Sequence, residues 1–234
     1  MTQSQPPYIS PSEAGVRPPA ALQATFLTQA FGWMFAGLLL TAAVSWWLSS
    51  NPALLATLSQ YLLLIFIGQI GLVVVISGAI NRISSTLALG LFFIYAATMG
   101  ITIGLVVSYY TTGSVVTAFL ASAAMFGGAA IYGATTKRSL AGLGGILFMG
   151  LIGLIVASLL NIFFQSDQIS WIISIVGVVI FTALTAYDVQ RIQAGDLAAR
   201  LGSMEKAAVI GALQLYLDFI NIFLFLLRIF GSRD

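Results

Sequence analysis

The sequence predicts an all-α polytopic membrane protein with seven transmembrane helices. Hydrophobic residues make up 59% of the 234 residues and charged residues only 7%, whereas soluble domains carry about 25% charged residues. The mean hydropathy is +1.03. A transmembrane helix needs roughly 20 apolar residues, and the chain contains seven such stretches: 26–49, 57–80, 86–110, 114–136, 140–164, 170–191 and 207–230. Strands of a transmembrane barrel would be about half as long and would alternate in polarity, so these stretches favour helices.

The first 24 residues differ from the rest of the chain. Five of the six prolines lie within the first 19 positions, with Gln and Ser between them and without the apolar segment of a signal peptide. We therefore expect a disordered, Pro-rich cytoplasmic tail at 1–24. The seven-helix transmembrane domain is expected at 25–231, followed by a short C-terminal tail at 232–234.

The basic residues predict the orientation of the spans. Cytoplasmic loops carry an excess of Lys and Arg, and the stretches between spans alternate between basic and uncharged. The loops after the first, third and fifth spans contain no Lys or Arg, and seven of the nine basic residues fall on the other side: Arg17, Arg82, Lys137, Arg138, Arg191, Arg200 and Lys206. The N-terminus is therefore expected in the cytoplasm, and seven full spans would place the C-terminus outside.

The composition also excludes several kinds of chemistry. The chain has no cysteine and no histidine, which excludes disulfides, thiol nucleophiles, imidazole metal ligands and catalysis that pairs His with Ser or Cys. The protein is expected not to be an enzyme and to have no catalytic residue and no bound cofactor. The usual near-neutral titrating side chain is absent, so any pH sensor would have to be a carboxylate. Membrane lipids are expected partners, and nucleic acid is not.

Two aspartates lie within predicted spans, where a carboxylate costs roughly 2.5 to 3.5 kcal/mol on insertion scales. Asp188 is in the sixth span and Asp218 in the seventh, and position 203 is halfway between them. If Gly202 and Ser203 form the tip of a helical hairpin, each aspartate lies about 22 Å from the tip at 1.5 Å per residue. We therefore predict that the two carboxylates meet.

Helical spacing supports this pairing. Polar and small residues recur every three or four positions on both spans, as expected for faces that point into a bundle or a wet cavity. On the sixth span this stripe is Ser174, Gly177, Phe181, Thr185, Asp188 and Arg191, and on the seventh it is Gly211, Gln214, Asp218, Asn221, Phe225 and Arg228.

Two carboxylates at hydrogen-bond distance in a low dielectric cannot easily both ionise, so the pair is expected to share a proton and titrate as a coupled unit. The protonated pair would tie the two helices together. The deprotonated pair would repel and offer oxygen ligands to a cation such as calcium. Arg82, on the same predicted side, could pair with Asp188.

Structural alternatives stay open for each of these residues. The aspartates could hydrogen-bond neighbouring polar groups simply to hold helices together. Arg82 could serve only as a topology charge, and Gln214 and Asn221 could serve only in packing.

The segments LTAYDVQRI and GALQLYLDFINIFLFLLRIFG, at 184–192 and 211–231, resemble the transmembrane Bax-inhibitor-motif family, the Bax inhibitor-1 group, and its bacterial branch in particular. The resemblance extends upstream through FGWMFAGLLLTAAVSWW and MFGGAAIYGATTKRSLAGLGGILFMGLIGLI. It implies seven helices, with the last one central and wrapped by the other six. It also implies a pH-sensitive calcium leak in which Asp188 and Asp218 are the sensing dyad. Arg82 matches the latch arginine of the family, and Thr185, Gln214 and Asn221 are candidate supporting polar residues.

Two other functions compete with a leak channel. Bacterial relatives of the family are linked to a membrane-bound AAA protease, so the chain could be a regulatory binding protein that does not transport. An intramembrane aspartyl protease also pairs aspartates on adjacent spans, and AYD at 186–188 fits its first motif. The second motif of that class is Gly-x-Gly-Asp, whereas this chain has Leu-Tyr-Leu-Asp at 215–218, and the bulky leucines leave less room for a substrate backbone.

Overall fold

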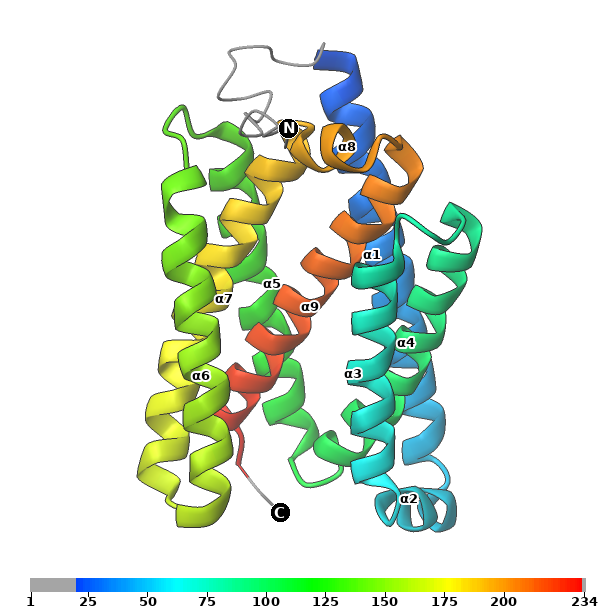
Figure 1. The fold of residues 1–234 in the computed structure, drawn as a ribbon. Helices are drawn as coiled ribbons and strands as arrows, with labels where there is room; N and C mark the ends of the chain where they lie inside the picture. Colours follow the sequence, from blue (N-terminus) through cyan, green and yellow to red (C-terminus); the bar gives the residue numbers. More distant parts are fainter. Residues whose placement is uncertain (1–19, 233–234) are drawn as a thin grey trace, which may run out of the picture.

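The computed structural model describes residues 20–232, and these residues fold into a helical bundle without β-strands (Figure 1). Most of the predicted tail and the last two residues lie outside this range. The elements are α1 (Ala20–Ser49), α2 (Pro52–Ser59), α3 (Leu62–Ala79), α4 (Ser85–Val107), α5 (Thr112–Thr135), η1 (Ala141–Leu143), α6 (Gly144–Phe164), α7 (Asp167–Gln193), α8 (Asp196–Leu201) and α9 (Met204–Phe230). α1 begins at Ala20, so residues 20–24 are helical and not part of an irregular tail.

Seven of the described helical segments are long and apolar enough to cross a membrane. The predicted all-α fold with seven membrane-spanning helices is therefore confirmed, and the protein is an integral membrane protein. Hydroxyl side chains fix where several of these helices begin. The N-cap residues of α4, α5, α7 and α9 each accept a hydrogen bond from a backbone N–H three residues further on; they are Ser84, Thr111, Ser166 and Ser203.

The second predicted span is interrupted near its start. The stretch 57–80 is divided between α2 and α3, with a break at Gln60 and Tyr61. Pro52 occupies the first position of α2, where a missing N–H costs nothing. α2 is thus a separate short helix at the end of the bundle opposite α8 (Figure 1), and α3 alone forms the span.

The connection between α7 and α9 also differs from the prediction. It is not a single hairpin tip at position 203, because the short helix α8 lies between the two arms. Gly195 and Gly202 flank α8 with φ angles of 77° and 61°, a conformation that glycine adopts at little cost. Asp188 is consequently near the end of α7, whereas Asp218 is deep within α9.

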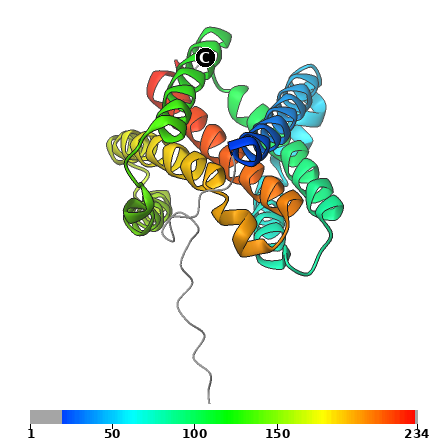
Figure 2. The same ribbon diagram turned by 90° about the horizontal axis from the view of Figure 1, so that it is seen from above.

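α9 is the most buried spanning helix. In its most apolar stretch 67% of the residues are buried, compared with at most 39% in any other span. α9 packs against α1, α4, α5 and α7, while α3 packs mainly against α4 and α6 mainly against α7. Figure 1 shows α9 crossing the bundle obliquely, and Figure 2 shows it between the other helices. The extensive contacts with α9 therefore come from four of the other six spans, and wrapping by all six stays a prediction.

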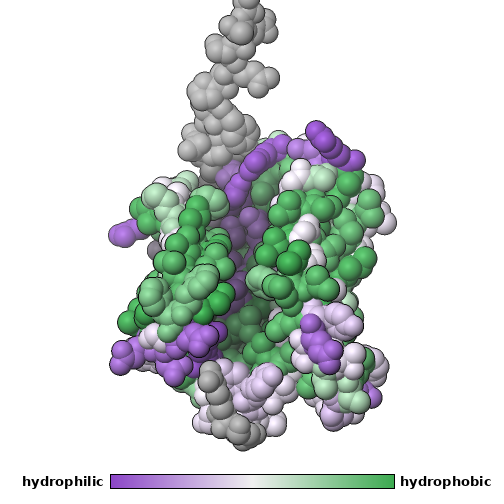
Figure 3. Space-filling view, turned by 60° about the horizontal axis from the view of Figure 1, so that its bottom comes forward, coloured by the Kyte–Doolittle hydropathy of each residue, from purple (hydrophilic) through white to green (hydrophobic). Residues whose placement is uncertain are grey.

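The outer surface fits a lipid environment. Large apolar side chains on the outer helices are exposed, including Phe66 on α3 and Phe163 on α6. Figure 3 shows apolar residues over the helix walls, with hydrophilic residues gathered at the ends and inside a hollow between two groups of helices. Polar groups thus reach between the helices while the lipid-facing walls stay apolar.

Candidate functional site: a buried aspartate pair

The structure brings Asp188 of α7 and Asp218 of α9 together. The two carboxylates are electrostatic neighbours, and their side chains are only 7% and 3% exposed. Since α9 runs obliquely, the carboxylates can be electrostatic neighbours although they lie at different depths along their helices. Asp188 is about 7 Å from the end of α7 and Asp218 about 21 Å from the start of α9, at 1.5 Å per residue.

The two predicted polar stripes face each other at this contact. A side chain at Gly177 would collide with the ring of Phe225, and that ring lies 6.0 Å from the ring of Phe181, centroid to centroid. Farther along the same faces, Thr185 lies within hydrogen-bonding reach of Asp218. The small residue in α7 thus lets α9 approach closely, and the helical period then sets the two aspartates against each other.

The hydrogen bonds at the pair are incomplete. Thr185 is fully buried, and its hydroxyl donates to the carbonyl oxygen of Phe181 at 2.8 Å. Oδ2 of Asp218 and Oε1 of Gln214, one helical turn away, are buried without a hydrogen-bond partner in the described part of the chain. Buried polar atoms are nearly always paired, so these two oxygens indicate a place that a proton, water or cation could occupy.

The other predicted polar residues are less directly involved. Nδ2 of Asn221 donates to the carbonyl oxygen of Leu217 at 2.8 Å, within α9. Among the described residues, no group of three or more acidic, His or Cys side chains could hold a metal ion. A calcium ion at Asp188 and Asp218 would therefore need backbone, amide or water oxygens to complete its coordination.

The positive charge nearest to Asp188 comes from its own helix. Arg191, one turn further along α7, interacts electrostatically with Asp188, as the spacing of three residues allows. Arg82 is exposed in the turn between α3 and α4. This turn lies beside the start of α9, where Nζ of Lys206 donates to the carbonyl oxygen of Asn81 at 3.5 Å. Sequence reasoning placed Arg191 on the stripe and among the basic residues that set the orientation, but did not pair it with Asp188.

A second buried polar cluster was not anticipated. The hydroxyl groups of Tyr216 and Thr41 lie 2.6 Å apart, and Thr41 also contacts the carbonyl oxygens of Gly37 and Ala96 at 3.0 and 2.9 Å. Tyr216 is fully buried. This cluster ties α9 to α1 and α4 through polar groups that each have a partner.

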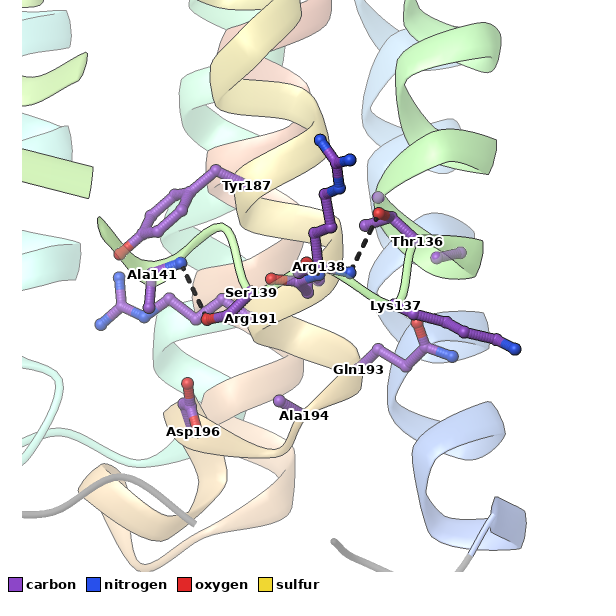
Figure 4. Close-up of a pocket in the computed structure, with 13 residues that line it drawn as sticks. Thr136, Lys137, Arg138, Ser139, Ala141, Tyr187, Arg191, Gln193, Ala194 and Asp196 are labelled. Carbon is purple, nitrogen blue, oxygen red and sulfur yellow. Dashed lines mark hydrogen bonds between the residues drawn. The ribbon is translucent and has the colours of Figure 1, made fainter. Parts of the chain in front are cut away.

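A cavity of about 430 Å³ lies on the α8 side of the pair. The end of α5, the loop between α5 and α6 and the end of α7 form its walls, and Figure 4 shows the side chains that line it. Tyr187 and Arg191 belong to this lining. The cavity therefore shares α7 with Asp188 and lies at the same end of the bundle as the basic loops.

These features define a polytopic helical membrane protein with a carboxylate pair buried between its last two spanning helices. The chain belongs to the Bax inhibitor-1 family: residues 23–234 match the family described as "Inhibitor of apoptosis-promoting Bax1". It is 42% identical to the "Inner membrane protein YbhL" of Escherichia coli over 230 residues, which cover 95% of this chain and 97% of the relative. An uncharacterized protein of Borreliella burgdorferi is 45% identical over 213 residues, covering 89% and 92%. An uncharacterized protein of Deinococcus radiodurans is 41% identical over 211 residues, covering 90% and 91%.

Proposed function

We propose that this protein is a pH-sensitive leak channel for calcium, or for cations more broadly, gated by a proton shared between Asp188 and Asp218. The observation that carries the proposal is the burial of both carboxylates, as electrostatic neighbours, between α7 and α9. Two like charges in a buried site repel strongly and lose their hydration. The pair is stable when it holds a proton, so its protonation state can control how closely the two helices pack.

Thr185 gives the pair a polar neighbour in this packed arrangement. Its hydroxyl donates to the carbonyl oxygen of Phe181 and lies within hydrogen-bonding reach of Asp218. Loss of the shared proton would introduce repulsion between Asp218 and Asp188, which favours separation of α9 from α7.

The path for a cation would follow the polar face of α9. The unpartnered oxygens of Asp218 and Gln214 lie four residues apart, and oxygen atoms are the ligands that calcium prefers. Asp188 and Asp218 supply the charge, and Gln214 and Thr185 supply neutral oxygens. Calcium is the transported ion in this proposal, and no cofactor is part of it.

The membrane is proposed to be the bacterial cytoplasmic membrane, with the N-terminus in the cytoplasm. The related protein of Escherichia coli is named an inner membrane protein. The described basic residues between spans all lie at the end of the bundle that carries α8 (Figure 1), as the positive-inside rule requires of the cytoplasmic end. Arg82 keeps its proposed latch role, and its place beside the first turn of α9 would let it restrain movement of that helix.

The test is calcium flux into liposomes that contain the purified full-length protein, scanned from pH 5 to pH 9. Wild type is expected to give flux that changes with pH. Asp218→Asn is expected to lose the pH response, because an amide mimics the protonated carboxyl and cannot ionise. Asp167→Asn is the matched control: it removes an exposed carboxylate at the first residue of α7 and should behave as wild type.

Absence of flux at any pH would overturn the channel proposal. The remaining candidate would then be a regulatory protein that binds a membrane complex such as a membrane-bound AAA protease. That function predicts that both aspartates can be replaced without loss of the cellular phenotype.

A further inference from the structure

The cavity between α5, the following loop and α7 has a concentration of positive charge that the aspartate pair does not explain. Lys137, Arg138 and Arg191 line it together with a single carboxylate, Asp196. The whole chain has only nine Lys and Arg residues, so one third of them meet at this cavity. Such a concentration favours an anionic ligand.

The wall that carries these charges is held in place. The side chain of Gln190 on α7 accepts a hydrogen bond from the backbone N–H of Leu140 at 2.7 Å and donates one to the carbonyl oxygen of Arg138 at 2.9 Å. Leu140 is buried and anchors the loop against α7. The loop backbone is therefore fixed, while the side chains of Lys137 and Arg138 stay exposed.

The three cationic side chains do not converge on one point. In Figure 4, Arg138 extends along α7 away from α8, whereas Lys137 and Arg191 point to opposite sides of the loop. This spread does not fit a single small ion held by all three residues. It fits a larger ligand that lies at the mouth of the cavity and carries a phosphate group within reach of some of these side chains.

The position of the cavity indicates where such a ligand would come from. Lys137 and Arg138 follow directly after the span α5, and Arg191 is in the last turn of the span α7, so the cavity lies where spans emerge from the bilayer. Basic pockets between helices on the cytoplasmic side bind the headgroups of anionic phospholipids. Arg in particular contacts phosphate through two parallel hydrogen bonds.

We propose that this cavity binds a phosphate-bearing anion, the headgroup of an anionic phospholipid of the adjacent leaflet, and that the long side chains of Arg138 and Arg191, which are not directed at one point in the structure, turn toward it on binding. Thr136, Ser139 and Tyr187 line the same cavity and provide hydroxyl donors for the remaining phosphate or glycerol oxygens. Arg191 also interacts electrostatically with Asp188, so a phosphate bound by Arg191 would weaken that interaction. An effect of lipid on ion flux rests on the proposed function, whereas the binding itself does not.

The experiment measures binding of fluorescent phosphatidylglycerol to the purified full-length protein in a neutral detergent, with fluorescent phosphatidylcholine as the uncharged comparison. We expect preference for phosphatidylglycerol. Arg138→Gln and Arg191→Gln should each weaken its binding about fivefold, since a basic residue near a lipid headgroup contributes about 1 kcal/mol. Arg138→Lys keeps the charge but not the two parallel hydrogen bonds, so its affinity should lie between those of wild type and Arg138→Gln. Arg200→Gln removes an exposed charge of α8 outside the cavity and should bind as wild type.

Competition with inorganic phosphate distinguishes a lipid headgroup from soluble phosphate as the natural ligand. Chloride at equal ionic strength is the control. Failure of millimolar phosphate to displace the lipid assigns the site to the lipid headgroup, and displacement assigns it to soluble phosphate. The proposal is overturned if phosphatidylglycerol binds no better than phosphatidylcholine and phosphate does not bind. It is also overturned if Arg138→Gln loses no more affinity than Arg200→Gln while its thermal unfolding matches wild type.

Discussion

Gly133 fixes the approach of α5 to α7, and replacing it tests the packing that places Asp188. A Cβ atom at Gly133 would lie 2.9 Å from Cα and from the carbonyl carbon of Ala186, and nearer still to its carbonyl oxygen. These are backbone atoms, so no side-chain rotation relieves the clash and the helices must separate. Overpacking of this kind costs about 1–3 kcal/mol. Ala186 is two residues before Asp188, so the separation would also displace the carboxylate.

Gly127 provides a matched control on the same helix. A Cβ atom there meets nothing within 4 Å, and both substitutions to alanine gain the same helix propensity, about 1 kcal/mol. The difference between Gly133→Ala and Gly127→Ala therefore isolates the clash and should be about 1–3 kcal/mol. For a chain of this size 1 kcal/mol shifts the unfolding temperature by about 2–4 °C. The assay is thermal unfolding in detergent followed by tryptophan fluorescence, and equal stability of the two variants would refute the packing.

Two further substitutions test contacts outside the aspartate pair. Tyr216→Phe removes the 2.6 Å contact with Thr41 and should cost about 0.5–1.5 kcal/mol, measured by thermal unfolding; an unchanged unfolding temperature would contradict a role for this contact in stability. Gln190→Ala removes both side-chain hydrogen bonds to the loop between α5 and α6, so trypsin should cleave after Lys137 and Arg138 several times faster than in wild type. Cleavage at the wild-type rate would show that the loop is held by other contacts.

The sequence alone predicts the spans and the interior face of α7 well. Periodicity identifies which face of a helix is buried, and the stripe from Ser174 to Asp188 is buried as expected. The predicted stripe on α9 is only partly buried, because Gln214 and Asn221 are half-buried and Arg228 is exposed. The electrostatic proximity of Asp188 and Asp218 follows from such faces on two consecutive spans. The symmetric hairpin was wrong because Gly195 and Gly202 both adopt positive φ angles and allow α8 to form between them.

Contacts between distant parts of the chain could not be predicted in the same way. Nothing local in the sequence indicates that the hydroxyl of Tyr216 meets Thr41, 175 positions earlier, because that contact depends on how α1 packs against α9. The same holds for the hydrogen bonds from Gln190 to the loop after α5. In contrast, the proximity of Arg191 to Asp188 could have been found, since it follows from a spacing of three residues within one helix.

The central claim is that Asp188 and Asp218 act as one titrating unit. The most direct test is a double-mutant cycle on the pH response of calcium flux in liposomes, with Asp188→Asn, Asp218→Asn and the double variant beside wild type. Residues that share one proton are strongly coupled, so each single variant should abolish the pH response of calcium flux. The double variant should then show the same flux and the same absence of a pH response as either single variant. Independent, additive losses in the two single variants, or a normal pH response in either one, would contradict a shared proton.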